Sequence, residues 1–208
     1  MKLRLLAPAV SATLLALCSC NTSRWSQPVT DPATPLALEG LSVLPPQGTN
    51  WYVVAEDDRN LVFARKYADE AVSTLASAST GESEVAFASP AGFLRHVERV
   101  LTDGRDQERA IGATCEARLT RRHGDFCVEY TETFLDRGAP SAEGRTLRVE
   151  NRGCWFLHPE DTGRSVVLLY SARRPSTDPR APARRRSGSS PGSASRPRAE
   201  PVRPRASP

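Results

Sequence analysis

The sequence predicts an α+β fold: a mainly antiparallel sheet with one principal amphipathic helix packed on a face, flanked by disordered termini. Two patterns support this prediction. One segment near the middle of the chain has apolar residues at helical spacing, and the segments around it have the alternation and turn residues of strands and hairpins. The 208 residues suffice for one domain with appendages.

The first 19 residues have the features of an export signal. A positively charged start, Met1 to Arg4, precedes an uncharged, mainly apolar run of 13 residues that ends at Leu17. This run is too short to span a bilayer as a helix, so it is typical of a signal peptide. Leu17 and Ser19 precede Cys20 in a pattern that resembles the bacterial lipobox. We therefore expect lipidation of Cys20, with ordinary signal cleavage near this site as the alternative.

Composition divides the remaining chain into three parts. Residues 20–40 are rich in Ser, Thr and Pro and are expected to form a lipid-anchored tether. Residues 41–172 are expected to form a single α+β domain, because about 130 residues can bury one modest core. Residues 173–208 are mostly Arg, Pro, Ser, Ala and Gly, a composition that cannot offset the entropy of ordering, so a disordered tail is expected.

Charge is distributed unevenly. The segment from Arg173 onward has a net charge of +8, whereas residues 20–172 carry −6. An acidic body does not attract phosphates, so we expect no nucleic-acid partner. The run Arg184-Arg185-Arg186 in the tail could dock on anionic lipid or glycan. Equally, the tail could be a GC-rich frame translated past its natural end, and the sequence leaves both interpretations open.

Three strands are predicted before the helix. Residues 51–55 and 61–65 flank a polar connection of the length that hairpins use. Residues 73–79 form a weaker third strand, since residues 69–76 could also start a helix. These strands supply the first half of the expected sheet.

The principal helix is predicted over residues 90–103. Its apolar side chains form a single stripe: Phe93, Leu94, Val97, Val100 and Leu101. Ser89 is suited to cap the first turn, Pro90 to the first helical position, and Gly104 to a stop. One face of this helix should therefore pack on the sheet.

The strands predicted after the helix are residues 114–120, 125–134, 146–150, 154–158 and 165–171. The first two form a hairpin centred on His123-Gly124. In its second arm, alternation places Val128, Tyr130 and Phe134 on one face. Glu132 falls on this apolar face, so either a bulge shifts the register or the carboxylate reaches the edge of the sheet. Residues 166–170 are apolar on both faces, which is typical of an interior strand.

Cysteine usage predicts one disulfide. Cys115, Cys127 and Cys154 belong to the predicted domain, and an odd number cannot all pair within one chain. The predicted hairpin places Cys127 opposite residues 119–120 and away from Cys115, and a disulfide needs Cα atoms within about 7 Å. We therefore favour a disulfide between Cys127 and Cys154, with a contribution of roughly 3 kcal/mol. Cys115 should be free and buried.

A zinc site is the alternative for these cysteines. Together with His123 or His158 they offer suitable atoms, but the short ligand spacings of zinc sites are missing. We therefore expect no metal and no cofactor.

No recognised catalytic motif occurs in the sequence. The third histidine, His96, falls at the border of the predicted apolar stripe, and His158 is held extended at a strand end by Pro159. Carboxylate pairs occur in or near predicted turns: Asp57 with Asp58, Glu82 with Glu84, and Asp103 with Asp106. We therefore expect no catalytic residue, but an enzyme acting on an envelope component through carboxylates or His158 is the alternative.

Several short motifs, in order along residues 40–173, resemble those of a group of small uncharacterised bacterial lipoproteins. The motifs are Gly40-Leu41-Ser42, Pro45-Pro46-Gln47-Gly48 followed by Trp51, Cys127-Val128-Glu129-Tyr130, His158-Pro159, and Tyr170-Ser171-Ala172-Arg173. The second cysteine of that group lies closer to the His-Pro pair than Cys154 does here. The resemblance implies a single-domain envelope protein with a lipidated N-terminus, and it transfers no catalytic role.

The leading functional hypothesis is therefore an envelope lipoprotein that acts as a non-enzymatic binding or structural module facing the periplasm. Several acyl chains, palmitate among them, make a stable anchor where one chain does not. Asn21 follows Cys20 where inner-membrane lipoproteins often carry Asp, so by resemblance we expect the periplasmic face of the outer membrane. An envelope protein or a glycan is the expected partner besides the membrane, whereas the sequence identifies no binding residues and no oligomeric state.

Overall fold

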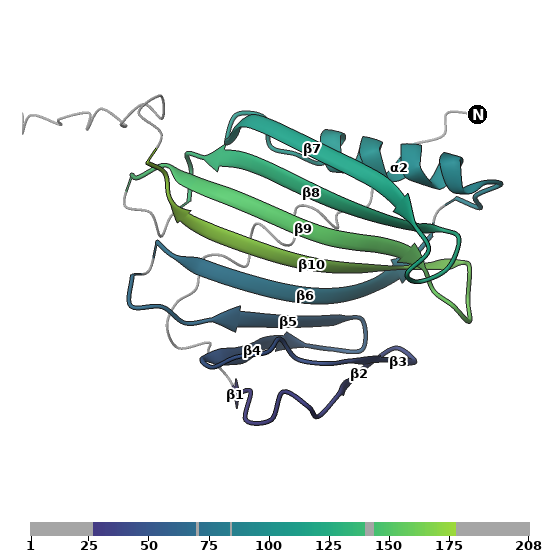
Figure 1. The fold of residues 1–208 in the computed structure, drawn as a ribbon, viewed down its shortest axis with the longest axis horizontal. Helices are drawn as coiled ribbons and strands as arrows, with labels where there is room; N and C mark the ends of the chain where they lie inside the picture. The colour runs from purple at the N-terminus through teal and green to yellow at the C-terminus, as the bar shows by residue number, and fades with distance from the viewer. Residues whose placement is uncertain (1–26, 70, 84, 140–143, 178–208) are drawn as a thin grey trace, which may run out of the picture.

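The computed structural model describes residues 27–69, 71–83, 85–139 and 144–177. The predicted signal peptide, the lipidation site Cys20 and the tail from residue 178 lie outside the described residues. The described chain contains one α-helix and ten strands (Figure 1). These are β1 (Gln27–Pro28), β2 (Leu36–Leu38), β3 (Leu41–Val43), β4 (Trp51–Glu56), β5 (Asn60–Arg65), β6 (Ser73–Glu82), α2 (Pro90–Asp103), β7 (Ala110–Thr120), β8 (Cys127–Asp136), β9 (Leu147–Leu157) and β10 (Arg164–Pro175).

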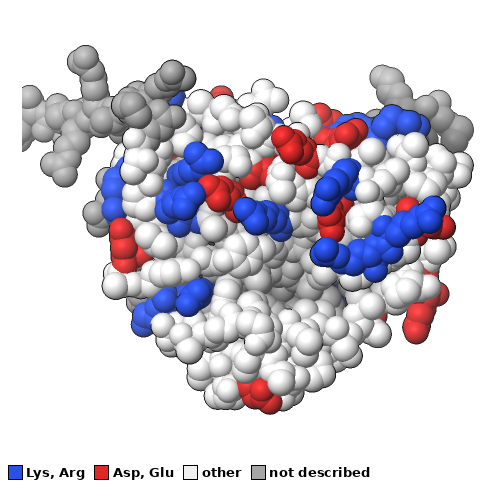
Figure 2. All heavy atoms as spheres, in the orientation of Figure 1, with Lys and Arg blue, Asp and Glu red and all other residues white. Residues whose placement is uncertain are grey.

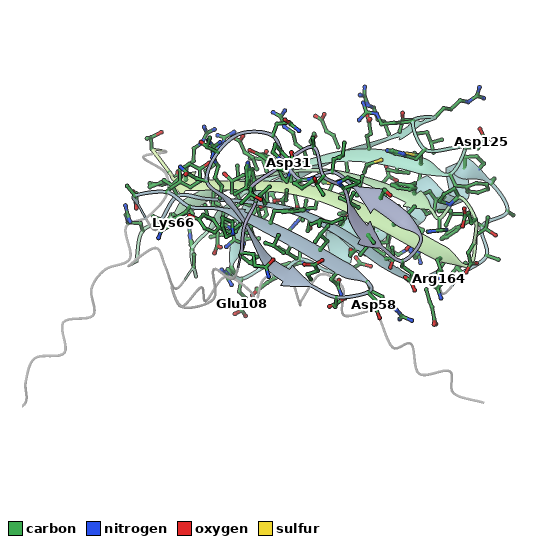
Figure 3. All side chains as sticks on the ribbon, turned by 90° about the horizontal axis from the view of Figure 1, so that it is seen from below. Asp31, Asp58, Lys66, Glu108, Asp125 and Arg164 are labelled. Carbon is green, nitrogen blue, oxygen red and sulfur yellow. The ribbon has the colours of Figure 1, made fainter. Side chains whose placement is uncertain are left out.

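Eight of the strands form one antiparallel sheet in the order β1-β4-β5-β6-β10-β9-β8-β7, and β2 and β3 form a separate hairpin. The chain builds β4 to β6 as neighbours, crosses by way of α2 to the far edge at β7, and returns strand by strand until β10 pairs with β6. Strand β10 is therefore an interior strand, as its apolar residues 166–170 predicted. Asp125 and Arg164 lie at one end of the long sheet and Lys66 at the other (Figure 3).

The predicted α+β class is wrong, because the fold is largely β. Strands account for 51% of the described residues and helix for 10%. The single helix covers only part of one face, where it packs mainly on β7 and β8. On the other face, the β2–β3 hairpin packs on the part of the sheet that β4, β5 and β6 form.

The helix itself lies at the predicted residues. The Ser89 side chain accepts a hydrogen bond from the Gly92 N–H at 3.2 Å, and the helix ends at Gly104. Phe93 and Val97 are buried against Val128 of β8 and Leu157 of β9. Local capping chemistry and one apolar stripe therefore determined this element fully.

Strand β9 is one uninterrupted strand where the sequence predicted two. The polar residues 151–153 interrupt its apolar pattern, but β9 pairs with β8 on one side and β10 on the other throughout. Gly153 lies opposite Tyr130, and a Cβ built on Gly153 would lie 2.2 Å from Cζ of the Tyr130 ring. The glycine therefore leaves the space that this buried ring occupies.

Residues 27–40, expected in the tether, take part in the fold. Strand β1 pairs with β4, and the fully buried Leu38 joins a cluster with Leu61 and Phe63. Glu39 fastens the hairpin to the sheet by accepting hydrogen bonds from Thr80 and Arg164. At the other end of the domain, β10 continues past residue 172 to Pro175 and therefore includes Arg173.

Candidate functional site

The residues of the enzymatic alternative do not converge. His158 is buried beside Gly40, and its Nδ1 accepts a hydrogen bond from the Glu160 N–H at 3.2 Å. His123 stacks on Phe156 in the turn between β7 and β8, with ring centroids 4.3 Å apart. Burial and the nearby Arg122 lower the pKa of His123. His96 lies on α2, with its ring edge-on to Phe87 and Trp155.

In two of the predicted carboxylate pairs, one member holds a turn. Asp57 accepts hydrogen bonds from the backbone N–H groups of Arg59 and Asn60, and Asp106 does the same for Glu108 and Arg109. Glu84 lies outside the described residues. Within the described part of the chain, no group of three His, Cys, Asp or Glu side chains could hold a metal ion.

The structure brings Cys127 and Cys154 together. They lie diagonally on the paired strands β8 and β9, and their Sγ atoms are 3.2 Å apart, unbonded. Burial, followed by the contact with Cys127, raises the pKa of the Cys154 thiol to about 12. Cys115 of β7 lies opposite Glu132 of β8 on the face that α2 covers. It is half-buried, whereas the sequence predicted that it is buried. The disulfide between Cys127 and Cys154 therefore stays a prediction, and the proximity of the two thiols supports it.

An open groove of about 820 Å³ runs along the sheet face opposite α2. Its floor comes from three neighbouring strands and is lined by four apolar residues: Phe63 and Ala78, which are almost fully buried, and Ala76 and Leu168, which are half-buried. Val43 and Leu44, at the end of the β2–β3 hairpin, form one wall, and Leu44 is 59% exposed. Figure 2 shows this face hollowed between the largely uncharged hairpin side and a band of charged side chains.

The charged band forms the second wall of the open groove. Arg118 and Arg122 both pair with Glu129, at 3.0 and 3.3 Å. Arg152 of β9 also lines the groove and is exposed, and its side chain makes no ion pair or hydrogen bond with the described residues. Tyr170 of β10 lies directly opposite Arg152 and is 45% exposed. The groove thus combines apolar residues on its floor with the Arg152 guanidinium at its rim, which is unpaired within the part of the chain that the structure describes.

A smaller cavity lies on the other face, between the sheet and the residues that follow α2. Most of its wall is apolar, and we call it the polar cavity after the buried charged side chains that it contains. It measures about 140 Å³. Glu132, the residue that contradicted the apolar alternation, stays in register there, with no bulge at its position. Its carboxylate lies 2.7 Å from the Arg105 guanidinium and accepts a hydrogen bond from Asn151 Nδ2 at 2.8 Å. Neither alternative proposed from sequence applies, because an ion pair under α2 accommodates the charge.

A second buried ion pair lies at the end of this cavity. Arg109 donates two hydrogen bonds to the fully buried Asp136, at 2.7 and 2.8 Å. Burial alone would raise the pKa of Asp136, but the hydrogen bonds from Arg109 and the Gly138 N–H, with the charges of Arg109 and Arg173, lower it overall. Asp136 is therefore ionised at neutral pH and holds the segment after the helix against β8.

Sequence reasoning missed both concave sites. Residues that line them, such as Arg152 and Asn151, stand in the polar stretch that was taken for a gap between strands. Arg173 was assigned to the basic tail. The only indication in the sequence was Glu132. A carboxylate on an apolar face needs a hydrogen-bond or ion-pair partner, so its position predicted a polar group nearby.

No protein-family model matches this sequence, and no curated protein matches it either. Among the described residues, no helix is both long and apolar enough to cross a membrane.

Proposed function

We propose that this protein is a non-enzymatic envelope lipoprotein, tethered through Cys20 to the periplasmic face of the outer membrane, whose open groove binds the acyl part of an anionic lipid. The observation that carries the proposal is the groove itself. Its volume of about 820 Å³ lies within the roughly 300–1,000 Å³ of small-molecule sites, and its floor is apolar.

The charge at the rim favours an anionic ligand. Arg118 and Arg122 share Glu129, whereas Arg152 has no partner among the described residues. Counting Glu116, the charged residues that line the groove sum to +1. An acyl chain on the floor would place a phosphate or carboxylate headgroup near Arg152, and a guanidinium binds such groups well.

The short link to the predicted anchor favours a ligand from the membrane. Gln27 of β1 is seven residues from Cys20, so the chain between them can extend over at most about 25 Å. Lipidation of Cys20 would therefore keep the groove close to the bilayer. A lipid is available at that distance in far greater amounts than a soluble metabolite.

Competition with a fluorescent fatty acid tests the groove. The mature chain with Cys20→Ser should bind the probe, and phosphatidylglycerol should displace it at lower concentration than phosphatidylcholine. Arg152→Glu should weaken displacement by phosphatidylglycerol at least tenfold and leave phosphatidylcholine unchanged. Arg99→Glu is the matched control, because Arg99 is an exposed arginine on α2. Equal displacement by both lipids, or no effect of Arg152→Glu, would contradict the proposal.

Intact mass after export tests the anchor. A mature species that begins at Cys20 and carries diacylglycerol is expected, and Cys20→Ala should leave the precursor unprocessed in the inner membrane. A soluble chain that begins elsewhere would show that the protein is not a lipoprotein.

A further inference from the structure

The two outer strands of the sheet differ in their capacity to pair with a further strand. Strand β1 at one edge is two residues long and ends in Pro28, which lacks an N–H group. Strand β7 at the other edge has 11 residues and forms the upper border of the sheet in Figure 1. The backbone groups on the outer side of residues 114–120 make no hydrogen bond with the rest of the described chain. An edge of this kind is a template for pairing with another chain.

The regular part of the β7 edge is a segment of seven residues. A bulge between Ile111 and Thr114, where Gly112 has a φ of +62°, interrupts the pairing with β8 near the start of β7. From Thr114 to Thr120 every residue has a partner on β8 without a break. Ala117 is the middle residue of this segment. A further strand can therefore pair regularly along these residues, with Ala117 at the centre.

One acidic and one basic side chain lie on either side of this midpoint. They are Glu116 and Arg118, which are both exposed and both line the open groove. Arg118 pairs with Glu129 of β8 at 3.0 Å. The Glu116 side chain lies opposite Thr131 and makes no ion pair or hydrogen bond with the described residues. The segment therefore presents opposite charges symmetrically about its centre.

Two copies of β7 that pair about a two-fold axis bring these charges together in only one register. The axis is perpendicular to the sheet, and residues at equal distances from it on the two strands lie opposite each other. With the axis at Ala117, Glu116 of each copy lies opposite Arg118 of the other, and the whole regular segment pairs. Moving the axis by one residue places Glu116 opposite Glu116 or Arg118 opposite Arg118. Like charges directly opposite destabilise a sheet, and further movement shortens the pairing.

The face that α2 covers favours the same register. Leu119 lies opposite Val128 on this face and is 41% exposed. With the axis at Ala117, Leu119 lies opposite Cys115 of the second copy, so pairing would bury apolar surface that one chain leaves exposed. The buried side chains of α2 pack inward from this edge, on Val128 of β8 and Leu157 of β9.

We propose that the protein forms a homodimer in which β7 pairs antiparallel with β7 of a second copy about a two-fold axis at Ala117. The two sheets become one continuous sheet, with both copies of α2 on the same side of it. Arg118 then lies between Glu129 of its own chain and Glu116 of the second copy, so the carboxylate that is unpaired in one chain gains a partner. The dimer does not rest on lipid binding in the open groove, and its tests use no lipid.

Exchange of the two charges tests the pairing in the mature chain with Cys20→Ser. By sedimentation equilibrium, Glu116→Arg and Arg118→Glu should each raise the dissociation constant of the dimer at least fivefold, because each places like charges opposite each other twice. An equimolar mixture of the two variants should regain dimerisation, and so should the double variant Glu116→Arg/Arg118→Glu, since every charge then faces its opposite. Asp58→Arg and Lys66→Glu are the matched controls, because both residues are exposed and lie outside β7.

Disulfide cross-linking tests the register. In Leu119→Cys, the new thiol would lie opposite Cys115 of the second copy, where Cα atoms of antiparallel neighbours are about 4.5–5.5 Å apart. Within one chain these two positions are about 13 Å apart along β7, too far for a disulfide. Mild oxidation should therefore give a covalent dimer whose mapped peptides link positions 115 and 119. Leu119→Cys combined with Cys115→Ala is the matched control and should give no covalent dimer.

Three results would overturn the proposal. The first is a wild-type protein that stays monomeric up to millimolar concentration, which would leave the β7 edge to a different chain. The second is a dimer whose dissociation constant is unchanged in Glu116→Arg and Arg118→Glu, or is not restored when the two are mixed. The third is oxidation of Leu119→Cys that gives no covalent dimer or one linked through any other pair of positions.

Discussion

The exported protein should contain a disulfide between Cys127 and Cys154, and reducing it should lower the stability measurably. The two Sγ atoms are already 3.2 Å apart on paired strands, so a small movement of the side chains suffices to join them. The bond would close a loop of about 26 residues. By the chain-entropy relation, this closure stabilises the folded protein by about 3 kcal/mol. For a domain of this size, about 3 kcal/mol corresponds to a fall in thermal midpoint of roughly 6–12 °C.

Urea unfolding with and without reductant measures this effect. The oxidised wild type should unfold at higher urea and with a smaller m-value than the reduced form, because the bridged unfolded chain exposes less surface. The double variant Cys127→Ala/Cys154→Ala should lose all sensitivity to reductant. Cys115→Ala is the matched control and should keep it. A wild-type midpoint that reductant leaves unchanged, or a mapped peptide linking Cys115, would refute the prediction.

The order of folding and oxidation can be tested in the same protein. Thiolates carry out thiol–disulfide exchange, and a pKa of about 12 leaves very little Cys154 thiolate at neutral pH. Folded, reduced protein should therefore oxidise slowly with glutathione disulfide and rapidly once urea unfolds it. Equal rates in the two states would show that the thiols are accessible in the fold.

Three further predictions concern the body of the protein. Gly153→Ala should cost about 1–3 kcal/mol in urea unfolding, because the new Cβ would lie 2.2 Å from the Tyr130 ring, and Tyr130→Ala should remove most of that cost in the double variant. Asp136 has a lowered pKa in the fold, so its stabilising effect is present above the unfolded pKa of about 4 and is lost as pH falls below it. Asp136→Asn should therefore destabilise by about 2–4 kcal/mol at pH 7 in urea unfolding and by much less at pH 3, and an equal loss at both would contradict this reasoning. Deleting residues 178–208 should leave the thermal midpoint unchanged in calorimetry, and a fall of several degrees would show that the tail packs on the body.

The elements that depend on local chemistry could be predicted from the sequence. Helix α2 lies at the predicted residues because Ser89, Pro90 and Gly104 determine its ends independently of the rest of the chain. The β7–β8 hairpin also has close to its predicted register, with Thr120 opposite Cys127. The fold class could not be predicted in this way, because it depends on how far each strand extends once neighbours pair with it. Strand β9 crosses its polar middle only because β8 and β10 flank it on both sides.

The N-terminal segment shows a second limit. Residues 27–40 have little apolar periodicity, yet Leu38 is fully buried, and Glu39 forms ion pairs with Arg59 of the β4–β5 turn and Arg164 of β10. Such contacts are specified by partners 20 to 125 residues away. A composition that indicates a tether therefore does not exclude a segment held by a few long-range contacts.

The polar cavity would have been visible in the sequence had the register of three strands been known. Glu132 of β8, Asn151 of β9 and Ser171 of β10 face one another in a single cross-strand row on the side that α2 covers. Arg173 lies two residues beyond Ser171 and therefore on the same face. Each residue alone resembles an ordinary break in an apolar pattern, and only the pairing shows that the breaks are contiguous. A contiguous row of polar residues beneath a helix cannot be solvated as surface residues are, so its hydrogen bonds must be met by ion pairs, water or a ligand. The two buried carboxylates of β8, Glu132 and Asp136, meet this requirement by pairing with Arg105 and Arg109 from the segment that follows the helix.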